Sequence, residues 1–193
     1  MNKKENAAQT IVLCGLFIAL GVLTPQIFHL FGAAAGQTFL PMHIPVLIAG
    51  LCVSPLCGAV SGIFSPMLSC IITSMPSPIK MPFMCVELFV YGLVSGFAMK
   101  LFSGHIKNYT VRVYASLITA QICGRAANIL CTAFGVYVLG LRNPAVSMKA
   151  ALMSVPTGLI GIAIQLIFIP PVAVVLNKYV TIGKKSYARK IQI

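Results

Sequence analysis

Residues 82–103 read PFMCVELFVYGLVSGFAMKLFS, and this stretch decides the fold. It is long and apolar enough to cross a bilayer as a helix, for which about 20 residues are needed. One acidic residue, Glu87, interrupts it near its start. A charged group at mid-bilayer costs ~2.5–3.5 kcal/mol even on the lenient insertion scale, so such a residue is usually turned inward and paired or solvated. We therefore expect a helical membrane bundle with a polar site inside it.

The composition of the whole chain predicts the same class of protein. Hydrophobic residues make up 59% of the 193 residues and charged residues 8%, with a mean hydropathy of +0.97. A soluble chain of this length could not cover so much apolar surface with so few charges, so the bilayer must solvate the outer faces. The net charge of +12 is then expected to act on topology and anionic lipid, and we predict no nucleic-acid partner.

Six segments are apolar enough to span, and the prediction is an all-α membrane protein with six transmembrane helices in a single integral membrane domain, residues 1–193. Little more than Ser54 and Pro55 separates the second segment from the third. The second is short and contains Pro45, so a kinked or partly re-entrant segment is the alternative. The expected spans are 8–31, 41–54, 55–74, 82–103, 111–139 and 149–177.

The distribution of Lys and Arg predicts the orientation, because cytoplasmic loops carry more of them. In a six-span arrangement only Lys80, Arg142 and Lys149 fall on the outer side, while Arg125 lies in the membrane. The N and C termini are therefore expected in the cytoplasm, with residues 178–193 as a basic cytoplasmic tail. The cytoplasmic set is Lys3, Lys4, Lys100, Lys107, Arg112, Lys178, Lys184, Lys185, Arg189 and Lys190.

Several kinds of chemistry find no support in the sequence. The seven cysteines show no C-x-x-C spacing and all lie in expected spans, which is typical of small apolar packing residues and not of a metal site. There is no G-x-x-x-x-G-K-[ST] motif, so the chain has no P-loop of its own. Asp is absent, so a Ser/His/Asp triad is excluded. We expect no catalytic residue, no metal and no cofactor.

A polar stripe runs through QICGRAANILCTAF, residues 121–134. Gln121, Arg125, Asn128 and Thr132 follow helical spacing, so they share one face of the fifth span. Glu87 is about one and a half turns from the outer end of the fourth span, at a depth similar to that of Arg125. One interpretation is a buried Glu87–Arg125 ion pair that only fixes helix register. The other is a ligand site in which Arg125 binds a carboxylate and Glu87 accepts hydrogen bonds.

Weaker candidates join this pair. Tyr91 is one turn beyond Glu87, Gln165 lies in GIAIQLIFIPP, and Gln37 lies in an outer loop small enough to act as a lid. His43 is as consistent with a capping role as with a ligand contact. The expected substrate-binding set is Glu87, Arg125, Asn128, Gln121, Tyr91, Gln165, Gln37 and His43.

Taken together, these residues resemble the substrate-binding (S) component of an energy-coupling-factor (ECF) vitamin transporter. The resemblance covers nearly the whole chain. It rests on LPMHIPVLIAGLCVSPLCGAVSGIFSPMLS, MPFMCVELFVYGLVSGF, CGRAANIL and GLIGIAIQLIFIPPVAVVLNK, in that order.

The resemblance implies a subunit of a bacterial plasma membrane importer that binds one micronutrient near the outer face. The partners it implies are a transmembrane coupling subunit and two ATPase subunits, which use the ATP. The small residues expected to dock on the coupling subunit are Gly15 and Ala19, where the family has A-x-x-x-A. Pantothenate is the substrate we favour, because Arg125 suits a carboxylate and aromatic residues are few. A thiamine-pyrimidine precursor comes second.

Two functions of other classes stay open from the sequence. Glu87 could carry the coupling proton of a secondary transporter, although only one carboxylate lies in the membrane and no inverted repeat is visible. The chain could also be a structural membrane subunit whose Glu–Arg pair binds nothing.

Overall fold

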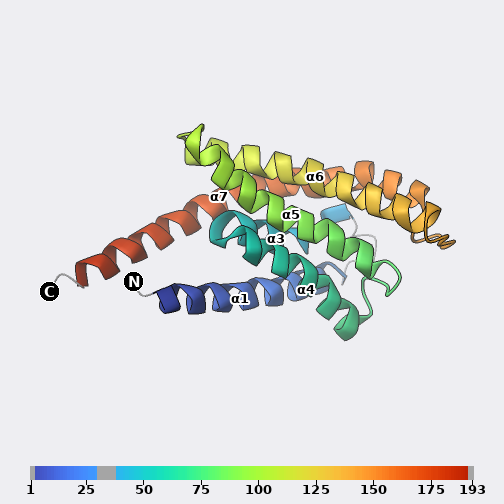
Figure 1. The fold of residues 1–193 in the computed structure, drawn as a ribbon, viewed down its shortest axis with the longest axis horizontal. Coiled ribbons are helices and arrows are strands. Elements are labelled where there is room, and N and C mark those ends of the chain that lie inside the picture. Colours follow the sequence, from blue (N-terminus) through green and yellow to red (C-terminus); the bar gives the residue numbers. More distant parts are fainter. Residues whose placement is uncertain (1–2, 30–37, 191–193) are drawn as a thin grey trace.

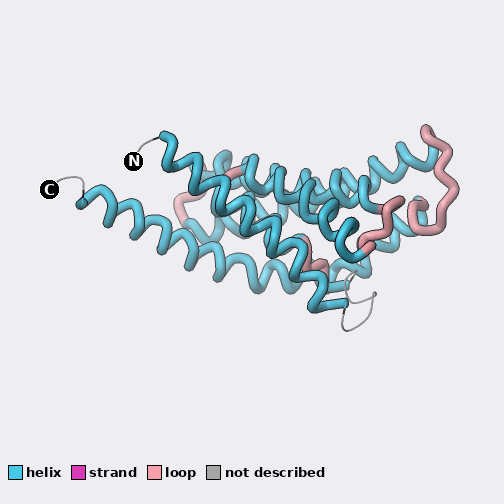
Figure 2. Tube along the Cα trace, turned by 90° about the horizontal axis from the view of Figure 1, so that it is seen from below, coloured by secondary structure: helices cyan, strands magenta, loops and turns pink. Residues whose placement is uncertain are grey.

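The computed structural model describes residues 3–29 and 38–190, with side chains described for residues 8–28 and 38–178. Within these ranges the chain is almost entirely helical and forms no sheet (Figure 2). In chain order the elements are α1 (Lys3–His29), α3 (His43–Ile48), the π-helical turn η1 (Ala49–Val53), α4 (Pro55–Thr73), α5 (Met81–Leu101), the 3-10 turn η2 (Phe102–Gly104), α6 (Tyr109–Tyr137) and α7 (Met148–Lys190).

The predicted all-α membrane fold is confirmed, but the six apolar helices are of unequal length. Five are long and apolar enough to cross a membrane: Ala8–Phe28, Pro55–Thr73, Met81–Gly104, Tyr109–Tyr137 and Met148–Lys178. The segment expected as a second span, 41–54, holds only the six residues of α3 and the five of η1. Together these rise about 16 Å, roughly half the thickness of the hydrocarbon core.

The short helix exists because other helices surround it. Residues Pro45–Ile48 of α3 are buried, and α3 contacts α1, α4, α5 and α7. Backbone at membrane depth is tolerated without a full span where protein covers it. The interrupted second segment expected from Pro45 is thus a short buried helix inside the bundle.

Local chemistry sets where α4 begins. Ser54 is extended, with φ −166° and ψ 157°, and its Oγ accepts a hydrogen bond from the Cys57 N–H at 3.1 Å. Pro55 follows in the first turn, where its missing N–H costs nothing. The chain therefore reverses sharply at this point, so that η1 and α4 run back along each other.

Glycines set how closely α4 and α5 pack. A Cβ on Gly92 would overlap the backbone of Gly58, and a Cβ on Gly62 would overlap the carbonyl of Leu88. Small residues at such crossings let helix backbones touch, which is the main source of packing energy between helices in lipid. The α4–α5 contact is the most extensive in the bundle, and it holds the start of α5 in place.

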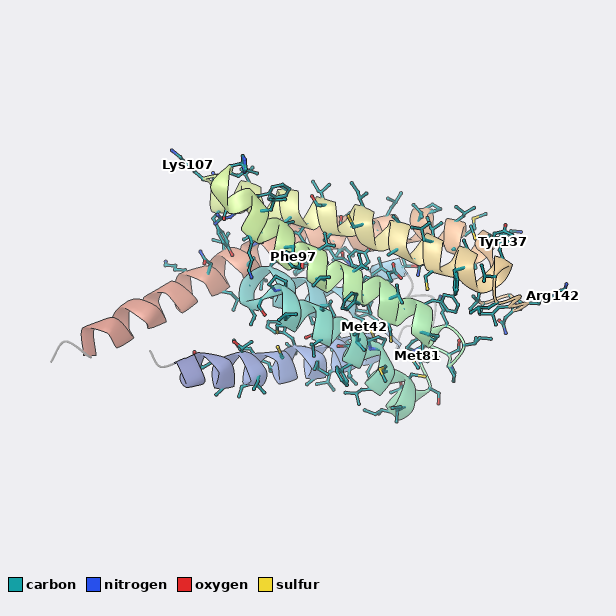
Figure 3. All side chains as sticks on the ribbon, in the orientation of Figure 1. Met42, Met81, Phe97, Lys107, Tyr137 and Arg142 are labelled. Carbon is teal, nitrogen blue, oxygen red and sulfur yellow. The ribbon has the colours of Figure 1, made fainter. Side chains whose placement is uncertain are left out.

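The two ends of the bundle can be told apart by the chain termini. Both chain termini lie at the same end (Figure 1). Lys107 is at this end, while Arg142 lies at the opposite end (Figure 3). We call the end with the termini the inner end and the other the outer end; their assignment to cytoplasm and exterior stays a prediction.

Candidate functional site

Glu87 of α5 is the centre of a buried polar cluster. It is 5% exposed. Its Oε1 accepts a hydrogen bond from Arg125 Nη1 at 3.0 Å, and its Oε2 accepts one from Asn128 Nδ2 at 2.9 Å. Arg125 and Asn128 are three residues apart on α6, so one helix face presents both donors. The carboxylate therefore has one charged and one neutral partner, which compensates its burial.

His43, at the start of α3, completes the cluster. Its Nε2 lies 3.8 Å from Glu87 Oε1, and its ring packs edge-on against Tyr91 with centroids 5.0 Å apart. His43 is 2% exposed, and neither ring nitrogen has a hydrogen-bond partner among the described residues. A buried imidazole without partners is costly unless something else satisfies it.

A cavity of about 580 Å³ lies above this cluster, at the outer end of the bundle. The end of α1, the residues before α3, the end of α4, the start of α5, the outer half of α6 and the start of α7 enclose it. Its volume falls within the range of small-molecule sites. Figure 3 shows Met42, one of its wall residues, in the middle of the bundle.

The wall combines apolar surface with hydroxyl groups. Leu40, Met42, Phe83, Met84 and Val146 supply apolar area, and Phe83 carries the only carbocyclic ring among the described lining residues. The ionisable residues among the described lining are His43, Lys80, Glu87 and Arg125. The hydroxyl-bearing lining residues are Ser69, Ser74, Ser77, Thr132, Ser147, Ser154 and Thr157.

The free edge of Arg125 does not face open space. Its Nε and Nη2 are buried and have no hydrogen-bond partner among the described residues. A Cβ on Gly158 of α7 would overlap Nη2, so the guanidinium lies directly against the backbone of α7. Of the two N–H groups on Nη1, one donates to Glu87.

Some of the residues expected at the site lie together in the structure, and others lie elsewhere. Glu87, Arg125, Asn128 and His43 lie together and line the cavity. Gln37 lies outside the described residues.

Three expected site residues lie outside the cavity wall. Gln121 Nε2 donates a hydrogen bond to Gln165 Oε1 at 3.1 Å, in a buried pair away from the lining. Tyr91 is 1% exposed and packs behind His43 without lining the cavity. Tyr91 therefore supports the cluster through His43, whereas Gln121 and Gln165 form a separate buried hydrogen bond.

Lining residues on α7 were not expected from the sequence. Ser154 and Thr157 lie three residues apart, and both line the cavity. That spacing is the one available signal, and it is weak because such pairs are common in helices. Lys80 was noted only as an outer-side charge, although it follows a run with prolines at 76 and 78 that brings the chain over the cavity.

The small residues expected to dock a partner face outward. Gly15 and Ala19 are exposed on α1, and a Cβ on Gly15 would meet nothing within 4 Å. They are therefore not used for packing within the described bundle.

Comparison with known protein families gives one match. A family model described as "ECF transporter, substrate-specific component" matches residues 9–173. The comparisons with curated proteins and with solved structures give no match.

Proposed function

The chain belongs to the ECF transporter substrate-specific components, and from this premise we propose that it is the high-affinity binding subunit of an ECF-type importer for a vitamin or related micronutrient. The observation that carries the proposal is the cavity of about 580 Å³ at the outer end of this multi-pass membrane protein, above the buried Glu87 cluster. Its volume and its convergent polar groups suit a small ligand.

Energy for uptake comes from partners in this proposal. The sequence has no P-loop, so ATP is used by two ATPase subunits joined to a transmembrane coupling subunit in the bacterial plasma membrane. The exposed Gly15 and Ala19 on α1 support docking on that coupling subunit, because small residues permit close approach of another helix.

Pantothenate is the substrate we propose. It is a flexible chain with a carboxylate, an amide and two hydroxyl groups, and the cavity offers cations and many hydroxyl groups to such a molecule. A thiamine-pyrimidine precursor is the second candidate. It is less well supported, because a planar ring is held best by stacking, and Phe83 and His43 are the only residues with aromatic rings among the described lining.

The roles within the site follow from the hydrogen bonds. Glu87 and the imidazole of His43 are the groups proposed to meet the hydroxyl or amide groups of the ligand at the floor of the cavity. Arg125 and Asn128 hold the carboxylate of Glu87 in place through Nη1 and Nδ2. Thr132, one turn further along α6, adds a hydroxyl to the wall.

Native mass spectrometry of the purified protein, followed by calorimetric titration with pantothenate, tests the substrate. We expect a retained small molecule of the mass of pantothenate, and saturable binding after it is removed. A retained vitamin of another mass, together with no heat on adding pantothenate, would replace the substrate while leaving the binding-subunit function intact. If the purified chain binds no micronutrient, the proposed function is wrong.

A further inference from the structure

The charges around the cavity do not balance. Lys80 and Arg125 are cations, and Glu87 is the one carboxylate among the described lining residues. The whole sequence has only two acidic residues and no Asp, and the second, Glu5, belongs to α1 near the inner end. Glu87 is bound by Arg125. The cavity therefore has one positive charge in excess, and Lys80 carries the one that is not in a direct ion pair.

Arg125 is poorly placed to bind an anionic ligand. One N–H of Nη1 is held by Glu87, while Nε and Nη2 are buried and Nη2 lies beside Gly158 of α7. Without moving α7 or breaking the pair with Glu87, a ligand could reach only the second N–H of Nη1. Breaking such a pair leaves Glu87 buried without its charged partner, which is strongly unfavourable.

Lys80 has none of these constraints. It lines the cavity, is partly exposed, and makes no hydrogen bond or ion pair with the described side chains. It directly precedes α5 and stands seven residues before Glu87, or close to two helical turns on the same face. The two charges are therefore separated by about 10 Å along the helix axis, with Lys80 at the outer end and Glu87 at the floor.

We propose that Lys80 binds the anionic group of the substrate at the outer end of the cavity, while the uncharged polar end of the substrate lies against Glu87 and His43. The unpartnered ring nitrogens of His43, which is 2% exposed, support a polar ligand group at that floor. The substrate class is thus an elongated monoanion, with hydroxyl or amide groups about two helical turns from its carboxylate. This inference rests on the proposed function, and it adds the orientation of the substrate in the cavity.

A cycle of protein and ligand variants tests the assignment. Wild-type protein and Lys80→Met are titrated by calorimetry with pantothenate and with pantothenol, in which an uncharged alcohol replaces the carboxylate. Loss of a charge-assisted hydrogen bond should weaken pantothenate binding roughly ten- to a hundredfold in Lys80→Met. Pantothenol binding should change less than about threefold, because pantothenol has no charge for Lys80 to bind. Lys80→Arg, which keeps the cation, should recover most of the pantothenate affinity.

Two further variants separate Lys80 from other cations. Lys149→Met removes an exposed outer-end charge on α7 that does not line the cavity, and it should leave both affinities unchanged. Arg125→Gln should weaken both ligands by a similar factor, because it acts through Glu87 and not through the carboxylate.

Each contrary outcome has a defined meaning. Equal loss for both ligands in Lys80→Met, or no loss for either, would overturn the role of Lys80 while the proposed function stands. A loss confined to pantothenate in Arg125→Gln would move the anion site to Arg125. If wild-type protein binds neither probe, the proposed substrate and this inference both fail.

Discussion

At the scale of single residues, the contribution of the Glu87–Arg125 pair to the stability of the fold can be separated from its role in ligand binding. Arg125→Gln leaves Glu87 buried with Asn128 as its remaining hydrogen-bond donor. Removing one partner of a buried pair typically destabilises a protein by about 3–5 kcal/mol. We expect a clearly lower Tm for Arg125→Gln in detergent, measured by thermal unfolding.

The double variant Arg125→Gln with Glu87→Gln distinguishes the role of the pair in stability from its role in ligand binding. It contains no buried charge at this place, so thermal stability should return close to that of the wild type. Ligand affinity should not return, because the carboxylate that accepts from the ligand has gone. Wild-type affinity in the double variant would show that the pair serves the fold alone.

The polar stripe on α6 shows how far sequence periodicity reaches at this scale. Spacing correctly places Gln121, Arg125, Asn128 and Thr132 on one face, but the structure divides that face. The last three line the cavity, while Gln121, one turn closer to the inner end, pairs with Gln165. Periodicity fixes a direction around a helix, whereas the depth of the cavity floor depends on side chains from other helices.

At the scale of elements, the five long spans were predictable, whereas for the short helix only the interruption at Pro45 was, and not its burial inside the bundle. Hydropathy over about 20 residues reports whether a helix can be exposed to lipid, and α1, α4, α5, α6 and α7 satisfy it. The α3 helix is shorter because the bundle buries it, and burial by partners distant in sequence leaves no local periodic signal. The position of Lys80 at the cavity was missed for a related reason: the loop before α5 folds over a cavity that only the assembled bundle creates.

The α4–α5 crossing gives a prediction at the same scale. In Gly92→Ala the added methyl group would overlap the backbone of Gly58, so the helices must separate. Overpacking of this kind typically costs 1–3 kcal/mol, so we expect roughly that loss in unfolding free energy. Gly15→Ala is the matched control, because its methyl group meets nothing within 4 Å. Equal stability of the two variants would show that the α4–α5 contact tolerates separation.

At the scale of the whole molecule, α1 presents its small residues away from the bundle. Gly15→Leu and Ala19→Leu should therefore block assembly with the coupling subunit and leave ligand affinity near that of the wild type. Co-purification with the coupling and ATPase subunits measures the first effect, and calorimetry the second. Ala126→Leu makes a similar change at an exposed position on α6 and should not affect assembly. An intact complex with both α1 variants would exclude this face as the docking surface.

The structure of the whole molecule also leads to a prediction about the energy source for uptake. In the proton-coupled carrier left open by the sequence, the Glu87 carboxylate would have to gain and lose its proton as the carrier moves between the two sides. Glu87 is instead fixed by Arg125 at 3.0 Å and Asn128 at 2.9 Å, and the sequence offers no other acidic residue within its expected spans.

The purified chain in liposomes should therefore bind substrate without accumulating it, with or without an imposed pH gradient. Accumulation should begin only when the coupling and ATPase subunits are reconstituted with ATP. Uphill uptake by the chain alone under a pH gradient would make it a secondary transporter, with Glu87→Gln as the variant expected to abolish that uptake.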